Sequence, residues 1–130
     1  MYRAAAASVC VVGMLMLTGC AVFGPQVPTE GPIAVYPRPD AGMDALLEGT
    51  LRITDECVWV EAYGRDVVVV FPAGDASVDD HRLTYLDREY VDGDDISLGG
   101  GHVTGAFGDD VYVPQGCGVL EEPFLVSPVW

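Results

Sequence analysis

Short runs of alternating polar and apolar residues, separated by turn-forming residues, limit the possible folds of this chain more than any other feature. Residues 50–54 (TLRIT) alternate as a half-buried strand does, and residues 57–63 (CVWVEAY) follow as a second strand. Gly64-Arg65 predicts a tight hairpin turn into a third strand over residues 66–71. The four successive valines of this third strand indicate that both of its faces are covered.

Shorter strands are expected farther along the chain. We predict them at residues 83–91, with a short helix as the alternative, and at residues 96–98, 103–107 and 111–113. Residues 72–80, rich in Asp, Gly and Ser, are expected to form a loop. Many short strands with turns roughly every 8 to 12 residues are typical of a β-sandwich or a β-barrel.

We therefore expect an all-β domain over residues 46–118. Because closure removes the exposed edges of a sheet, the expected fold is a small closed β-barrel of about five or six strands, OB-like or similar. Residues 20–45 contain five of the nine prolines and are expected to be a Pro/Gly-rich tether. The alternative is a linker that packs on the domain through apolar residues 33–36. Residues 119–130 are expected to be a C-terminal tail.

The first 19 residues have the layout of a signal peptide. Arg3 supplies a cation, residues 4–18 are uncharged and mostly apolar, and small residues precede Cys20. The run is shorter than the roughly 20 apolar residues that a membrane-spanning helix needs. The stretch Leu17-Thr18-Gly19-Cys20 resembles the lipobox of bacterial lipoproteins.

This resemblance implies a lipid-anchored protein on the extracytoplasmic face of the cell membrane. Residues 1–19 would be removed, and the Cys20 thiol would carry a diacylglyceryl group that binds the membrane. The alternatives are an ordinary secretory signal that happens to contain a cysteine, and an apolar helix that is not cleaved.

Charge restricts the partners of the chain. It has 6 Lys+Arg and 20 Asp+Glu residues, and its net charge is −14. Removal of residues 1–19 takes away Arg3 and leaves 5 − 20 = −15. So acidic a chain is not expected to bind nucleic acid, because phosphate binding needs clustered Lys and Arg. An envelope protein or a cell-wall glycan is the expected partner beyond the membrane itself.

Cys57 and Cys117 are an even pair in a chain that is expected to be exported, which predicts a disulfide between them. Two free thiols or half a metal site are the alternatives. The absence of C-x-x-C spacing and the presence of only two histidines argue against zinc. No cofactor is expected.

The acidic turn around residue 93 offers weak candidate metal ligands. Asp92, Asp94 and Asp95 begin like a calcium loop, but no glutamate occupies the twelfth position that an EF-hand requires. Residues 79–81 (DDH) are better explained as a solvated loop. Serines lack a G-x-S-x-G context, so no catalytic residue is assigned.

Aromatic side chains provide a further candidate, a stacking face for sugar or peptide. At strand spacing such residues are more often part of the core and its rim, which is the reading we favour. The aromatic residues concerned are Trp59, Tyr63, Tyr85, Tyr90 and Tyr112.

The domain also resembles a set of uncharacterised actinobacterial lipoproteins. The matching stretches are residues 48–51 (EGTL) before Cys57, residues 71–74 (FPAG) after the valines, and residues 91–94 (VDGD) before residues 98–101 (LGGG). These stretches are turns and core, so the resemblance implies fold and location only. The expected function is a non-catalytic binding or envelope-assembly module. The alternatives are a calcium- or other metal-binding envelope domain and an envelope hydrolase.

Overall fold

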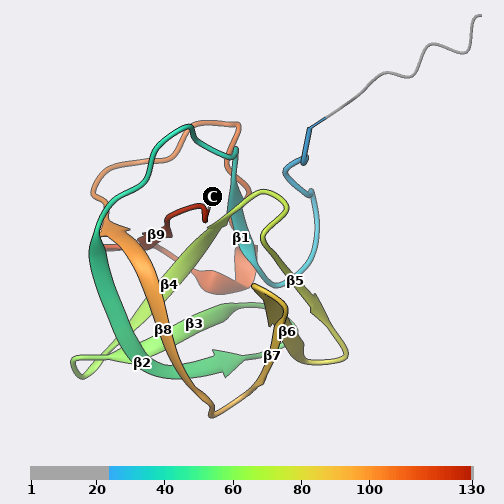
Figure 1. The fold of residues 1–130 in the computed structure, drawn as a ribbon, viewed down its shortest axis with the longest axis vertical. Helices are drawn as coiled ribbons and strands as arrows, with labels where there is room; N and C mark the ends of the chain where they lie inside the picture. Colours follow the sequence, from blue (N-terminus) through green and yellow to red (C-terminus); the bar gives the residue numbers. More distant parts are fainter. Residues whose placement is uncertain (1–23, 130) are drawn as a thin grey trace, which may run out of the picture.

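The computed structural model describes residues 24–129, and within them the regular secondary structure is almost entirely β-strand (Figure 1). One turn of 3₁₀ helix, Gln115–Cys117, is the exception. No helix among these residues is long and apolar enough to cross a bilayer. The strands are β1 (Ala34–Tyr36), β2 (Ala45–Ile53), β3 (Val58–Ala62), β4 (Arg65–Pro72), β5 (Ala76–Asp79), β6 (Arg82–Tyr85), β7 (Arg88–Val91), β8 (Asp95–His102) and β9 (Phe124–Val126).

Five strands close into a barrel. β3 pairs antiparallel with β2 and β4, β2 pairs antiparallel with β8, and β8 pairs antiparallel with β9. A parallel pairing between β9 and β4 completes the ring. The chain passes from β4 to β8 without the two strands being neighbours, which is Greek-key connectivity of the OB-like kind. The predicted all-β closed barrel is therefore confirmed.

β1 is an additional strand that lies parallel to the end of β4. Its register places Ala34 opposite Val70 and Tyr36 opposite Pro72. The hydroxyl of Tyr36 donates a hydrogen bond to the carbonyl of Val126 at 2.5 Å and so joins β1 to β9. Val35 also forms an isolated bridge with Tyr112.

A three-stranded meander, β5-β6-β7, occupies the connection from β4 to β8. Leu83 and Tyr85 of β6 are buried in the main core, and the Tyr85 ring lies 5.4 Å from that of Phe71. The two hairpin turns of the meander place both central residues at positive φ: Asp80 and His81 in one, and residues 86–87 in the other. These are the dihedrals that two-residue hairpins need, because they match the twist of the strands.

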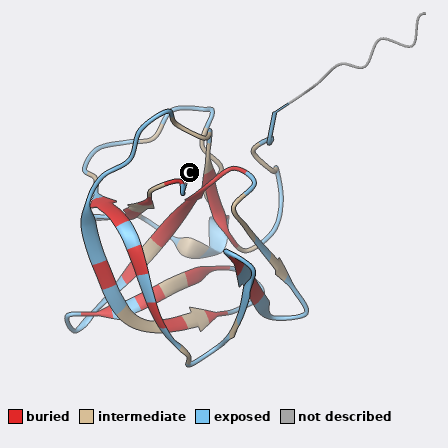
Figure 2. Cartoon of the chain, viewed as in Figure 1, coloured by how far each residue is buried: buried red, intermediate tan, exposed pale blue. Residues whose placement is uncertain are grey.

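The core is made by alternation along the barrel strands (Figure 2). Every second residue of β3 is buried, and β8 buries Ile96 and Leu98 between exposed neighbours. In β4, Val67, Val69 and Val70 are buried and Val68 is half-buried. The four valines are thus covered on both faces, mainly toward the end of the strand where β1 joins it.

Two predicted domain boundaries differ from the structure. The expected tether over residues 20–45 contains β1, and Ile33 and Val35 are core residues. The expected tail over residues 119–130 contains β9, whose Phe124 and Val126 are fully buried. Nearby prolines led the sequence analysis to miss both strands. These prolines lie outside β1 and β9, so they remove no N–H group from the paired residues themselves. The folded unit therefore extends beyond the predicted limits of 46–118 at both ends.

Individual strand predictions were also partly wrong. Residues 83–91 form two strands, because residues 86–87 turn the chain in the left-handed region. The predicted loop over residues 72–80 contains β5. Residues 103–107 and 111–113 are not strands, and Tyr112 takes part only in the bridge with Val35. Residues 103–107 pair with no strand, and residues 111–113 meet β1 at this single residue pair, which is too short to count as a ladder.

Candidate functional site

The predicted disulfide is present and joins two connections of the barrel. Cys57, in the connection from β2 to β3, is bonded to Cys117, in the long connection from β8 to β9, and their Cα atoms are 5.0 Å apart. The residues that precede the two cysteines also approach closely, because a Cβ on Gly116 would lie 2.3 Å from Cβ of Glu56. The bond therefore ties a segment without regular structure to the barrel wall.

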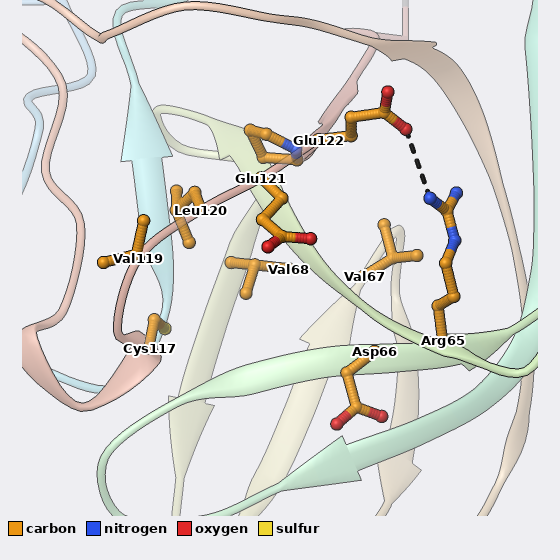
Figure 3. Close-up of a pocket in the computed structure, with 10 residues that line it drawn as sticks. Arg65, Asp66, Val67, Val68, Cys117, Val119, Leu120, Glu121 and Glu122 are labelled. Carbon is orange, nitrogen blue, oxygen red and sulfur yellow. Dashed lines mark hydrogen bonds and ion pairs between the residues drawn. The ribbon is translucent and has the colours of Figure 1, made fainter.

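After Cys117 the chain runs beside the first half of β4 and forms a groove with it (Figure 3). The groove encloses about 320 Å³ and is lined by residues 65–68 on one side and by residues from 117–123 on the other. Val68, Val119 and Leu120 supply apolar surface. Val119 is 93% exposed, which is unusual for a valine beside a core strand. We call the groove between residues 65–68 and the segment 117–123 the β4 groove.

The β4 groove carries more negative than positive charge, with three carboxylates and one guanidinium among its lining residues. Nη1 of Arg65 lies 3.2 Å from Oε2 of Glu122, and both side chains are about half exposed. This pair uses the single cation among the lining residues. The carboxylates of Asp66 and Glu121 form no ion pair or hydrogen bond within the described part of the chain. Figure 3 shows the Glu121 carboxylate pointing from its segment toward β4. The arrangement suits a ligand that carries positive charge and some apolar surface.

The acidic residues considered as calcium ligands have other roles. Asp92 accepts hydrogen bonds from the backbone N–H of Ile53 at 2.9 Å and from Nε of Arg52 at 3.0 Å. The hydrogen bond from Ile53, and then the charge of Arg52, lower the pKa of Asp92. Asp94 accepts from the N–H of Val91 at 2.8 Å. Asp95 begins β8 and lies opposite Thr50.

These contacts show carboxylates that hold a turn and a strand end. In residues 24–129 no group of three or more His, Cys, Asp or Glu side chains is placed to hold a metal ion. The other polar cluster is also divided, because His81 contacts Asp55 of the β2–β3 connection rather than the neighbouring aspartates.

The aromatic residues do not gather on one face. Tyr85 is in the core, and Tyr90 is half-buried beneath the guanidinium of Arg88, 5.7 Å from its ring centre. Tyr63 is exposed at the β3–β4 turn. The hydroxyl of Tyr112 donates to the carbonyl of Gly31 at 2.7 Å. Trp59 is half-buried on β3.

The residues of the β4 groove were not singled out by sequence reasoning, which placed the second wall in a tail. One sequence feature could have indicated this wall: two apolar and two acidic residues, Val119-Leu120-Glu121-Glu122, follow one another between Cys117 and Pro123. What the sequence lacks is any indication that this stretch lies against β4. Cys20, the predicted lipid attachment site, and the predicted signal peptide lie outside the described residues.

The fold and the disulfide together define a class: a small, disulfide-linked, OB-like β-barrel. Comparison with known proteins adds no narrower assignment, since no family model, curated protein or solved structure matches the chain. The function is therefore argued from the site itself.

Proposed function

We propose that this protein is a lipid-anchored module of the cell envelope that binds a partner outside the cytoplasmic membrane and catalyses no reaction. The observation that carries the proposal is the disulfide between Cys57 and Cys117, in a chain whose N-terminal segment ends in Leu17-Thr18-Gly19-Cys20. Structural disulfides form and persist in oxidising compartments. An export signal and a disulfide are independent features, and both favour the same side of the membrane.

The anchor follows from lipid chemistry. A diacylglyceryl group on Cys20 would bury two acyl chains, each methylene contributing about 0.8 kcal/mol. One chain binds a membrane only marginally, and two chains anchor it stably. Such an anchor suits this acidic chain, because its charge gives it no electrostatic attraction to anionic headgroups.

Binding, rather than catalysis, is favoured by the groove. The β4 groove has a hollow, apolar contact surface and unpaired charge, which are the elements of a recognition surface. The acidic residues and the histidine suggested by sequence are engaged in turns or in isolated pairs. OB-like barrels also commonly bind ligands through their loops and adjacent strands.

Mass spectrometry of the protein purified from its own membranes tests the proposal. We expect the mass of residues 20–130 plus a diacylglyceryl group. Cys20→Ser should abolish the lipid mass, whereas Cys10→Ser is the matched control, because Cys10 would leave with the signal peptide. An unmodified chain that still begins at Met1 would overturn the proposal.

A further inference from the structure

β4 is paired unevenly along its two edges. On one edge Arg65 to Val68 pair with β3, from Ala62 back to Trp59. On the other edge, the pairing of β4 with β9 begins only at Val69, which lies opposite Phe124. Among the described residues no strand pairs with residues 65–68 on this second edge. The barrel wall therefore has a short open edge, and the β4 groove lies along it.

Strand geometry indicates which backbone groups face the open edge. In an antiparallel pair of strands, two kinds of residue pair alternate. Residues of one kind exchange two backbone hydrogen bonds with each other, and residues of the other kind direct their N–H and C=O groups away from the partner strand. The two-residue turn at Tyr63-Gly64 makes Ala62 and Arg65 a hydrogen-bonded pair. Val60 and Val67 form the next such pair. The N–H groups of Asp66 and Val68 therefore face away from β3, toward the groove.

An open edge with outward N–H groups is a template for another strand, and extended peptides bind proteins by this mode. The opposite wall of the groove is held in place. The Cys57–Cys117 bond fixes its beginning, and β9, starting at Phe124, fixes its end. A groove held at both ends costs little ordering entropy when it binds.

The charges specify what kind of strand fits. Asp66, Glu121 and Glu122 against Arg65 give the groove a local charge of 1 − 3 = −2. Cationic side chains would gain from Asp66 and Glu121, and the net charge of −14 would steer them to the molecule. Successive side chains of an added strand point to opposite faces, so cations beside Asp66 would place the intervening side chains on the face of Val67. Val67 is buried, so these intervening side chains should be small and apolar. An acidic peptide would be repelled, and a neutral glycan would gain nothing from these carboxylates.

We infer that the β4 groove binds an extended basic segment of a partner protein, which adds to β4 as a strand beside Asp66 and Val68. The inference deepens the proposed function and rests on it for the location of the partner. It names the chemistry of the partner: alternating Lys or Arg and small apolar residues in an extended conformation.

Peptide binding to the full disulfide-bonded chain in zwitterionic detergent tests the inference. The probe is a fluorescein-labelled peptide of alternating lysine and valine, and its binding is followed by fluorescence anisotropy. Two matched peptides serve as controls: one with glutamate for lysine, and one with alternate backbone amides methylated. We expect binding of the first peptide alone. Amide hydrogen exchange, followed by NMR, should slow at Asp66 and Val68 when it binds.

Variants of single acidic residues distinguish binding in the β4 groove from a general attraction of the peptide to the acidic protein. Asp66→Asn and Glu121→Gln should each raise the Kd about two- to five-fold, as expected for a partly exposed charge pair. Asp79→Asn, an exposed acid on β5, makes the same charge change elsewhere and should leave the Kd unchanged.

Three results would overturn the inference: equal binding of the glutamate peptide, unchanged exchange at Asp66 and Val68, or protection of these amides by a chitin oligosaccharide instead of the peptide. The lipid test is independent. An unlipidated chain that binds the basic peptide would overturn only the proposed location, whereas a lipidated chain that does not bind it would overturn only the inference.

Discussion

At the residue scale, Asp92 shows how a carboxylate in a turn stabilises structure without binding a ligand. It accepts from the N–H of Ile53, at the end of β2, and from the Arg52 side chain, so it joins the β7–β8 turn to a strand far away in sequence. Sequence alone marked the same residue as a candidate calcium ligand, because both roles need an exposed carboxylate in a turn. The contacts across the chain distinguish them.

Asp92→Asn is expected to lower the Tm at pH 7 while leaving the fold intact. The folded pKa of Asp92 lies below its ordinary value of 3.8, so the ionised group stabilises the fold above that pH. This contribution is lost as the pH falls through the folded pKa. The Tm difference between the two proteins should therefore be largest above pH 3.8 and shrink below it, as measured by circular dichroism across pH. A pH-independent difference would contradict the assigned role.

Gly49→Ala is expected to destabilise the barrel strongly. A Cβ at residue 49 would lie 2.3 Å from the carbonyl oxygen of Glu61, a backbone atom that cannot move freely. Overpacking of this kind costs about 1–3 kcal/mol. Gly99→Ala is the matched control, because a Cβ there meets nothing within 4 Å, and it should change stability by less than about 0.5 kcal/mol. Urea denaturation of both variants measures the difference, and equal stabilities would contradict the packing argument.

At the element scale, the long connection between β8 and β9 depends on covalent attachment. Residues 103–123 hold one turn of 3₁₀ helix and no strand, yet they form one wall of the β4 groove. Their backbone is joined to β1 by the two hydrogen bonds between Tyr112 and Val35, and the disulfide attaches them to the β2–β3 connection. Stability and groove shape are therefore coupled through the same bond.

Replacement of both Cys57 and Cys117 by alanine is expected to cost about 4 kcal/mol of unfolding free energy, since the bond closes a loop of 60 residues. Urea denaturation measures this loss, and reduction of the native protein should reproduce it. Peptide binding in the β4 groove should weaken as well. A loss below about 1 kcal/mol would show that the loop is held mainly by other contacts.

A chain that ends at residue 118 is expected not to fold. It lacks β9, which pairs with both β8 and β4, and it loses the fully buried Phe124 and Val126. The barrel would then be an open sheet with two exposed edges. Circular dichroism and amide exchange would show the loss. A cooperative thermal transition in this shortened chain would mean that residues 119–130 are not needed for folding, as the sequence alone predicted.

At the scale of the whole molecule, the barrel lies closer to the proposed anchor than a proline-rich tether implies. Val27 packs against the core, and a Cβ on Gly74 would be 2.8 Å from Cβ of Pro25. The chain thus joins the folded unit near residue 25, five residues after Cys20. At about 3.6 Å per residue at full extension, this segment spans at most roughly 18 Å.

We therefore expect the lipidated protein to hold its barrel within about 20 Å of the headgroups. A tether extending to residue 45 would allow roughly 75 Å. Neutron reflectometry on a supported bilayer measures the gap. A variant with twelve Gly/Ser residues inserted after residue 23 is the control and should widen it. A wide gap for the unmodified protein would show that residues 25–32 detach from the barrel.

The alternation of residues in β2, β3 and β4 and the tight turn between β3 and β4 are local properties. The sequence alone was therefore enough to predict an all-β domain with these three strands, although the turn lies at Tyr63-Gly64, one residue before the predicted position. The pairing of Cys57 with Cys117 was predictable as well, because the domain contains no other cysteine. Three-residue strands such as β1 and β9 carry too few residues for a periodic signal, and their neighbours are prolines.

Only the tertiary structure decided how the barrel closes and where its wall stays open. β9 meets β4 over two residue pairs, Val69 with Phe124 and Val70 with Leu125, and this register leaves Asp66 and Val68 at a free edge. Such contacts join residues more than 50 positions apart and depend on the packing of the whole core. The identities of the residues set which strands form, and the three-dimensional pairing sets which of their backbone groups remain available to a partner.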